Sequence, residues 1–274
     1  MIRAARALIL AMALALVLAA PFGAAPALAQ DSSVRSVAGH FSAAQAAGFS
    51  KQIERDLAAR GARVAIVFRS GRSRDHLPDG VAYTHNAFWV HRTVRTAAGE
   101  TLNGYAVYNL YAGDGKAWPV LESRLIQDWP VDFVMGSAVD DVAVIVPSPE
   151  MQRRLIALID SPSYQRLHNS AYSLVANPFV GRYQNCTTFV LDVVAAAAWE
   201  TDDPARLGAD LAAHFKPTTV KANGLTRLFG PIADARLRTD DHRGPVRTAT
   251  YESLAKFMGD NGLLQETYSL SYIP

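Results

Sequence analysis

The spacing of apolar residues limits the fold more than any other feature of this sequence. Phe49, Ile53 and Leu57 repeat at helical spacing within residues 41–60, and Gly61 stands where a helix is expected to stop. Short stretches rich in aromatic and β-branched residues follow, and helical patterns return only after residue 147. Strands are expected at 63–69, 81–94, 104–111, 121–126 and 142–146, with a short extended piece at 133–135.

The second half of the chain carries helix signals. Ser148, Pro149 and Glu150 combine a cap, a first-turn proline and an early acid, so a helix is predicted from there to residue 159. Further helices are expected at 186–199, 203–215 and 251–258. Strands and helices are therefore segregated. This order predicts an α+β fold, an antiparallel sheet packed against helices, and disfavours a doubly wound nucleotide-binding sheet.

The first 29 residues have the pattern of a signal peptide. Arg3 and Arg6 precede an apolar run at 7–20, helix-breaking residues follow, and Ala27-Leu28-Ala29 supplies a small-x-small cleavage pattern. The apolar run is shorter than the ~20 residues that cross a bilayer. The alternative is an uncleaved N-terminal anchor. We expect cleavage, a single domain over residues 30–274, no membrane span afterwards, and a periplasmic or secreted location.

Charge argues against a nucleic-acid partner. Removal of Arg3 and Arg6 lowers the 27 basic residues to 25, which equals the number of acidic residues. Nucleic-acid-binding domains normally carry a clustered basic face. Arg69, Arg72 and Arg74 form one small basic cluster, and because acidic residues follow directly we interpret it as a solvated loop.

Cys186 is the only cysteine, so an exported chain cannot use it for an internal disulfide. It follows Asn185 at the predicted start of an apolar helix. Free backbone amides and the helix dipole favour a thiolate there, and a thiolate is the form that acts as a nucleophile. Gln184 or Asn185 is a candidate donor to an oxyanion. The simpler interpretation is that Asn185 only caps the helix and Cys186 packs beneath it as a small apolar residue.

His85 is the best-placed base for such a thiol. It is a polar residue at the start of an aromatic strand, and Ala87 on the same face leaves room for a helix start to approach. His91 shares that face and ranks second, and a purely structural histidine is the other interpretation. A third group usually orients the base, and Asn109 on the neighbouring strand is the candidate. Gln127 and Asp128 are its rivals.

Four motifs carry a resemblance to known families. They are Tyr83-Thr84-His85-x-Ala87-Phe88-Trp89, Gly104-Tyr105-Ala106-Val107-Tyr108-Asn109-Leu110-Tyr111, Gln127-Asp128-x-Pro130 and Gln184-Asn185-Cys186-Thr187. A histidine strand followed by a helix that begins Asn-Cys resembles the circularly permuted NlpC-like peptidases. These papain-fold relatives include lecithin:retinol acyltransferase-like enzymes, and their histidine also precedes the cysteine. The permuted relatives often have His-x-Gly where this chain has His85-Asn86-Ala87. Over nearly the whole mature chain, the sequence is similar to an uncharacterised family of exported bacterial proteins, domain of unknown function 2145.

The resemblance implies a permuted papain-like core in which Cys186, His85 and Asn109 form the catalytic group. The expected function is a thiol hydrolase or acyltransferase acting on an amide, ester or thioester of a small-molecule, peptide or lipid substrate, without a cofactor. The alternative is a non-catalytic binding or structural protein of the cell envelope that keeps this fold. No zinc motif, serine-hydrolase elbow or complete phosphate loop occurs, so no metal site is predicted.

Overall fold

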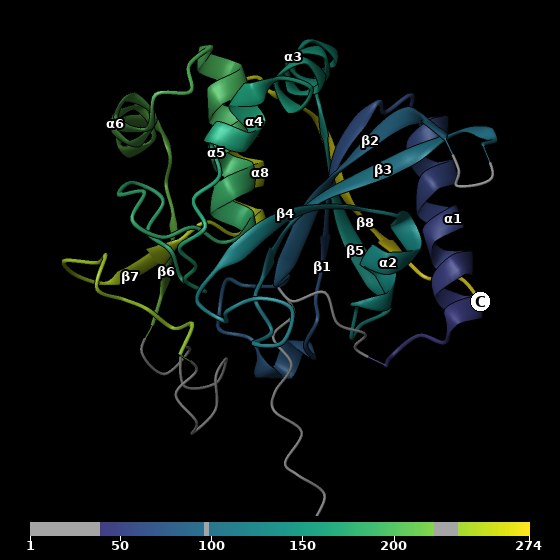
Figure 1. Cartoon of the computed structure of the whole chain (residues 1–274), viewed down its shortest axis with the longest axis horizontal. Coiled ribbons are helices and arrows are strands. Elements are labelled where there is room, and N and C mark those ends of the chain that lie inside the picture. Colours follow the sequence, from purple (N-terminus) through teal and green to yellow (C-terminus); the bar gives the residue numbers. More distant parts are fainter. Residues whose placement is uncertain (1–38, 96–98, 222–234) are drawn as a thin grey trace, which may run out of the picture.

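A computed structural model describes residues 39–95, 99–221 and 235–274. A six-stranded antiparallel sheet in the order β4-β3-β2-β1-β5-β8 divides the molecule into two layers (Figure 1). Its strands are β1 (Val64–Arg69), β2 (His85–Arg95), β3 (Thr101–Ala112), β4 (Ser123–Asp128), β5 (Asp141–Pro147) and β8 (Leu264–Ser271). The predicted α+β class with an antiparallel sheet is confirmed.

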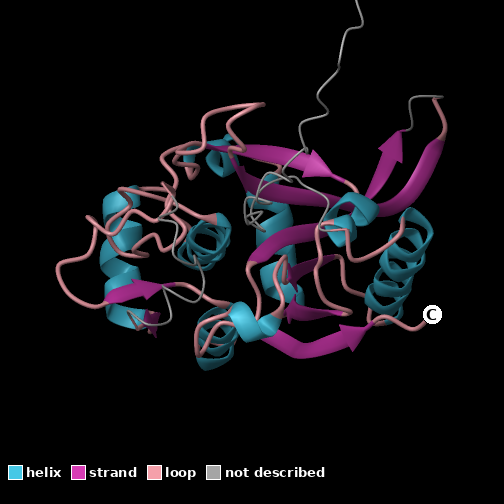
Figure 2. Ribbon diagram, turned by 90° about the horizontal axis from the view of Figure 1, so that it is seen from below, coloured by secondary structure: helices cyan, strands magenta, loops and turns pink. Residues whose placement is uncertain are grey.

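Helices α1 (Ala43–Ala59) and α2 (Pro130–Met135) cover one face of the sheet (Figures 1 and 2). A capping box between Ser42 and Gln45 starts α1, and Gly61 leaves it with a φ of 66°, a left-handed conformation that favours glycine. The periodic residues of α1 named above are all fully buried. The predicted helix is therefore confirmed, and its apolar stripe forms this side of the core.

Five of the described helices gather on the other side of the sheet. They are α3 (Pro149–Ile159), α4 (Pro162–Arg166), α5 (Cys186–Trp199), α6 (Pro204–His214) and α8 (Tyr251–Asp260). Of these, α3, α5 and α8 contact the strands, and α6 packs on the outer side of α5 (Figure 1). A two-stranded sheet of β6 (Thr218–Val220) and β7 (Val246–Thr248) and a short 3-10 helix, η1 (Arg74–His76), complete the described elements.

The pleat of each central strand sends alternate side chains to the two sides. On β2, Phe88 and Val90 join the core beneath α5, whereas Ala87 and Trp89 join the core beneath α1 and α2. All six residues of β1 are buried because both of its faces are covered. Neighbouring residues on one strand therefore belong to different cores, and this alternation decides which groups can meet.

Several predicted details differ from the structure. The piece at 133–135 was predicted to be extended, but it lies in α2, where Pro130 occupies the first turn and Asp132 accepts from the backbone NH of Trp129. The edge strand β8 was not predicted, although its burial alternates along its whole length. The predicted signal peptide, residues 1–29, lies outside the described residues. None of the described helices is long and apolar enough to span a membrane.

Candidate functional site

Helix α5 begins at Cys186, as predicted from the sequence. Asn185 is its N-cap: the side-chain oxygen accepts from the backbone NH groups of Thr187 (3.0 Å) and Thr188 (2.9 Å). The hydroxyl of Thr188 accepts from the backbone NH of Asn185 at 2.8 Å, which completes a capping box. The thiol therefore lies in the first turn of an apolar helix, where the helix dipole favours a negative charge.

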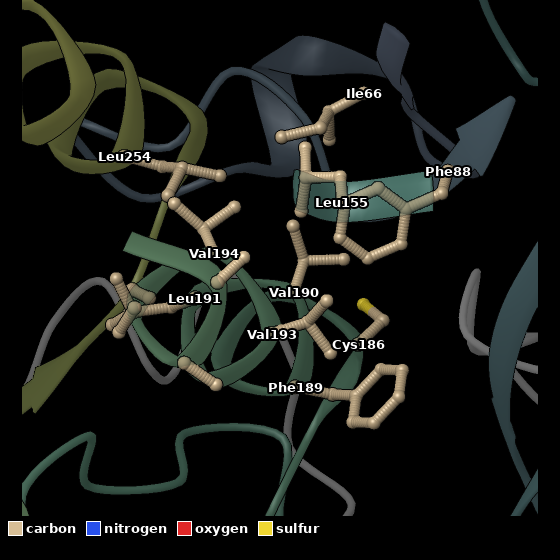
Figure 3. Close-up of a cluster of buried hydrophobic side chains, with 14 of the residues drawn as sticks. Ile66, Phe88, Leu155, Cys186, Phe189, Val190, Leu191, Val193, Val194 and Leu254 are labelled. Carbon is tan, nitrogen blue, oxygen red and sulfur yellow. The ribbon is translucent and has the colours of Figure 1, made fainter. Parts of the chain in front are cut away.

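The surroundings of Cys186 are apolar. The residue is 3% exposed and belongs to the core cluster that also holds Phe88, Phe189 and Val190 (Figure 3). The sulfur makes weak contacts with the Thr84 carbonyl oxygen at 3.9 Å and with the Thr187 hydroxyl at 3.8 Å. Desolvation disfavours an anionic sulfur in such a place and opposes the helix dipole.

His85 lies on the opposite face of the sheet. It is fully buried, its ring stacks on Tyr111 with centroids 5.1 Å apart, and it contacts Phe133 of α2. Its Nε2 is 3.1 Å from Asn109 Oδ1. Because an amide oxygen only accepts, Nε2 donates and the neutral ring leaves Nδ1 unprotonated. Asn109 thus lies where the sequence placed an orienting group for His85.

The pKa of His85 is held well below its ordinary value. Burial is the largest cause, the guanidinium charge of Arg69 acts in the same direction, and the bond to Asn109 opposes both. The imidazole is therefore neutral near pH 7. Within the described residues its Nδ1 has no hydrogen-bond partner, and neither has Nδ2 of Asn109.

The predicted Cys186–His85 pair is not assembled. No hydrogen bond joins the sulfur to His85 Nδ1, and the two side chains lie on opposite faces of the sheet. The residue that β2 turns toward the start of α5 is Asn86, whose Nδ2 donates to the Thr187 hydroxyl at 2.9 Å. The sequence located both elements correctly, but the pleat of β2 sends its histidine to the side away from the thiol.

The two predicted oxyanion donors are engaged elsewhere. Nε2 of Gln184 donates to the Leu167 carbonyl (3.0 Å) and to Asp192 Oδ2 (2.8 Å), and its Oε1 accepts from Asn169 N at 2.9 Å. Nδ2 of Asn185 donates to the Leu174 carbonyl at 3.1 Å and faces the Thr248 hydroxyl at 3.4 Å. Both amides therefore hold the chain around α5, and the simpler interpretation of Asn185 as a cap agrees with the structure.

The rival residues take other places. Asp128 is buried and accepts from the Tyr111 hydroxyl at 3.0 Å, so it supports the ring on which His85 stacks. Gln127 donates to the Asp128 carbonyl at 2.9 Å. His91 is exposed and packs its ring against Tyr105. Asn109 is the candidate that bonds directly to His85.

Arg69 corrects another prediction. It was interpreted as part of a solvated loop, but it is 1% exposed at the end of β1, opposite His85. Its guanidinium donates to the Gly136 carbonyl and lies over the Phe133 ring at 5.3 Å. A Cβ at Gly136 would collide with that guanidinium, so a larger residue there would displace the arginine from this position. Arg74, by contrast, is an exposed residue that pairs with Asp141 at 2.8 Å.

The described residues contain no group of three His, Cys, Asp or Glu side chains placed to hold a metal ion. What the sheet does hold, beneath α2, is a buried polar cluster of Arg69, His85, Asn109, Tyr111 and Asp128, which we call the His85 cluster.

The fold and this site define an α+β protein with an antiparallel sheet that carries a buried histidine–asparagine pair. The chain belongs to the family described as "Uncharacterized protein conserved in bacteria (DUF2145)", whose model matches residues 56–258. The match includes all four motifs noted in the sequence. No curated protein and no solved structure matches the chain.

Proposed function

We propose that this chain is an exported, non-catalytic protein of the bacterial cell envelope, a binding or structural module on a permuted papain-like core. The order of a histidine strand, an asparagine strand and a helix that begins at a cysteine supports that core, as does the bond between His85 and Asn109. The segment at 1–29 supports export.

One observation carries the non-catalytic assignment: the sulfur of Cys186 and the ring of His85 lie in different cores on opposite sides of β2. Thiol catalysis needs a base within hydrogen-bond reach of the nucleophile, and the substrate needs access to both. Cys186 is 3% exposed and His85 is 0% exposed, so neither group meets solvent in this arrangement.

Alkylation of Cys186 by iodoacetamide across a range of pH tests the proposal. The folded protein should react slowly and only above about pH 8, as an ordinary or buried thiol does. His85→Ala should leave that profile unchanged as long as the variant is folded. The same protein unfolded in denaturant serves as the control, because its thiol should label completely.

The second candidate function is the thiol hydrolase or acyltransferase. The hydrogen bonding of the His85 ring favours it, since Nε2 is held by Asn109 while Nδ1 has no hydrogen-bond partner among the described residues. With the two groups together, Nδ1 would take the thiol proton, the sulfur would bond to the acyl carbon, and the leaving group would depart with that proton. Water or a second acceptor would then release the acyl group.

The same alkylation series separates the two candidates. Fast labelling below about pH 7 that His85→Ala abolishes would favour the hydrolase and overturn the non-catalytic proposal. Slow labelling that is indifferent to residue 85 would exclude the Cys186–His85 pair.

A further inference from the structure

A cavity lies on the outer side of α5, away from the sheet. Its volume is about 260 Å³, and it is lined by the α4–α5 connection, α5 and α6. Leu167, Pro178, Phe179 and Leu207 form an apolar wall. Asn169, Gln184, Thr188 and Asp192 contribute polar groups on the other walls. Apolar walls with a few convergent polar groups are typical of small-molecule sites.

Asp192 is the only carboxylate among the residues that line this cavity. It is partly buried on α5, and its Oδ2 accepts from Gln184 Nε2 at 2.8 Å. No ion pair within the described residues reaches it. Burial raises the pKa of this carboxyl to about 7, although the Gln184 bond acts in the opposite direction. Among the residues that the structure describes, this acid on the cavity wall thus has no counter-charge.

The other titratable groups on the wall do not neutralise Asp192. Arg166 is engaged with Asp202, with Nε 3.0 Å from Oδ2. Nε2 of His168 is 3.0 Å from the Ser123 hydroxyl, and burial lowers the pKa of this histidine, so its ring is neutral. Tyr183 donates to Asp240 at 3.0 Å. The cavity therefore has an excess of negative charge when Asp192 is ionised.

The cavity walls are held by specific contacts. Asn177 accepts from the backbone NH of Phe179 at 3.1 Å, and Asp241 accepts from the backbone NH of Asn177 at 2.8 Å. Helix α6 approaches this loop so closely that a Cβ at Gly208 would lie 2.8 Å from the Phe179 carbonyl oxygen. The loop and the helix are thus fixed against each other, and the space between them does not depend on a loose side chain.

We propose that this cavity binds a small organic cation, an amine of roughly amino-acid size, whose ammonium group pairs with Asp192. A bound cation supplies the counter-charge that the partly buried carboxylate lacks, while the apolar wall covers the body of the ligand. The volume is below the roughly 300–1,000 Å³ of drug-sized sites, which limits the occupant to a small molecule. The inference rests on the proposed binding function and names the class of ligand.

Benzylamine is a suitable probe, with benzyl alcohol as its neutral equivalent and benzoate as its anionic one. Calorimetry on the purified protein at about pH 8, where Asp192 is mostly ionised, should show binding of benzylamine only. Asp192→Asn keeps the acceptor for Gln184 but removes the charge, and it should weaken the affinity at least about tenfold, or about 1.4 kcal/mol. Asp210→Asn on α6 is the matched control: its carboxylate pairs with Arg206 outside the cavity, and it should bind like the wild type.

A second readout does not depend on the variant. Near pH 7, Asp192 is about half protonated and the amine is charged, so their pairing should release about half a proton per ligand. Near pH 8, where both groups are mostly charged before binding, the release should be much smaller. Titrations in buffers of different ionisation enthalpy measure this release. Absence of benzylamine binding, equal binding of benzyl alcohol, or binding without proton release at pH 7 would each overturn the inference.

This failure is distinguishable from failure of the proposed function. If Cys186 reacts slowly and the protein binds none of the three probes, the amine site is wrong and the non-catalytic assignment is retained. If Cys186 is reactive and its reactivity depends on His85, the non-catalytic assignment is wrong, whether or not benzylamine binds.

Discussion

The two faces of the sheet differ in how they are filled. Beneath α5 the core is almost wholly apolar and contains Cys186 as one small member of it. Beneath α1 and α2 an apolar core meets the His85 cluster, in which an arginine, a histidine, an asparagine and an aspartate are buried together. Both faces are built from the same strands. Successive side chains of β2 point to opposite faces of the sheet. A shift of one residue along the strand therefore decides whether a side chain lies on the face of the Cys186 thiol or on the face of the His85–Asn109 pair.

The largest expected effect comes from closing the space in which the Arg69 guanidinium lies. Gly136→Ala puts a methyl group onto that buried guanidinium and displaces it from the Gly136 carbonyl and the Phe133 ring, so we expect a loss of about 3 kcal/mol in the free energy of unfolding. Denaturant unfolding measures it.

Gly48→Ala is the matched control for this change. Gly48 lies within α1, and a Cβ there meets nothing within 4 Å, so alanine should stabilise by about 0.5–1 kcal/mol. Equal effects of the two substitutions would mean that the buried arginine is not held against Gly136.

The next effect is the pH dependence of stability, which we expect to come from His85 on the α1–α2 face of the sheet. The folded pKa of His85 is depressed, so below the unfolded value of about 6.5 the unfolded chain binds the extra proton. The stability that His85 contributes is present above that pH and is lost as the pH falls, by up to about 1.4 kcal/mol per pH unit. Unfolding of the wild type and of His85→Phe at about pH 7 and about pH 5 measures this loss.

His85→Phe fills a similar volume and cannot titrate, so the difference between the two proteins isolates His85 from His168, which remains in both. Between about pH 7 and about pH 5 the wild type should lose roughly 2 kcal/mol more than the variant. Parallel pH profiles would show that His85 exchanges protons freely with solvent and that the cluster is open.

Much of this arrangement was accessible from the sequence. The cap at Asn185 and the apolar run behind it predicted the first residue of α5, and an asparagine on the strand next to His85 predicted their contact. The choice of face was not accessible, because every position of β1 is buried and its pattern does not distinguish the two sides. Arg69 was misplaced because a charged residue at the end of a strand looks like the start of a loop, whatever covers it.

Asp192 was missed although the sequence contains a signal for it. It stands within Phe189-Val190-Leu191-Asp192-Val193-Val194, where one acid interrupts an apolar helix that has few polar positions. Such a residue either lies on the solvent-exposed face of the helix or is buried in a functional or structural role, and the pattern alone does not distinguish the two. The α4–α5 connection and α6 pack over this face of α5 and make it a cavity wall. The sequence pattern of α5 does not contain that tertiary packing.

The smallest effect tests the apolar face. Cys186→Ala removes one sulfur from a packed core and should cost about 1 kcal/mol in the free energy of unfolding. Cys186→Ser retains the shape but buries a hydroxyl. The Thr84 carbonyl oxygen and the Thr187 hydroxyl are 3.9 and 3.8 Å from the sulfur, too far for a good O–H hydrogen bond without local movement. Serine should therefore be less stable than alanine by about 1 kcal/mol. Chemical unfolding of the two variants gives the order directly. A serine variant more stable than the alanine variant would place the sulfur in polar surroundings, and the contrast between the two faces of the sheet would no longer hold at the start of α5.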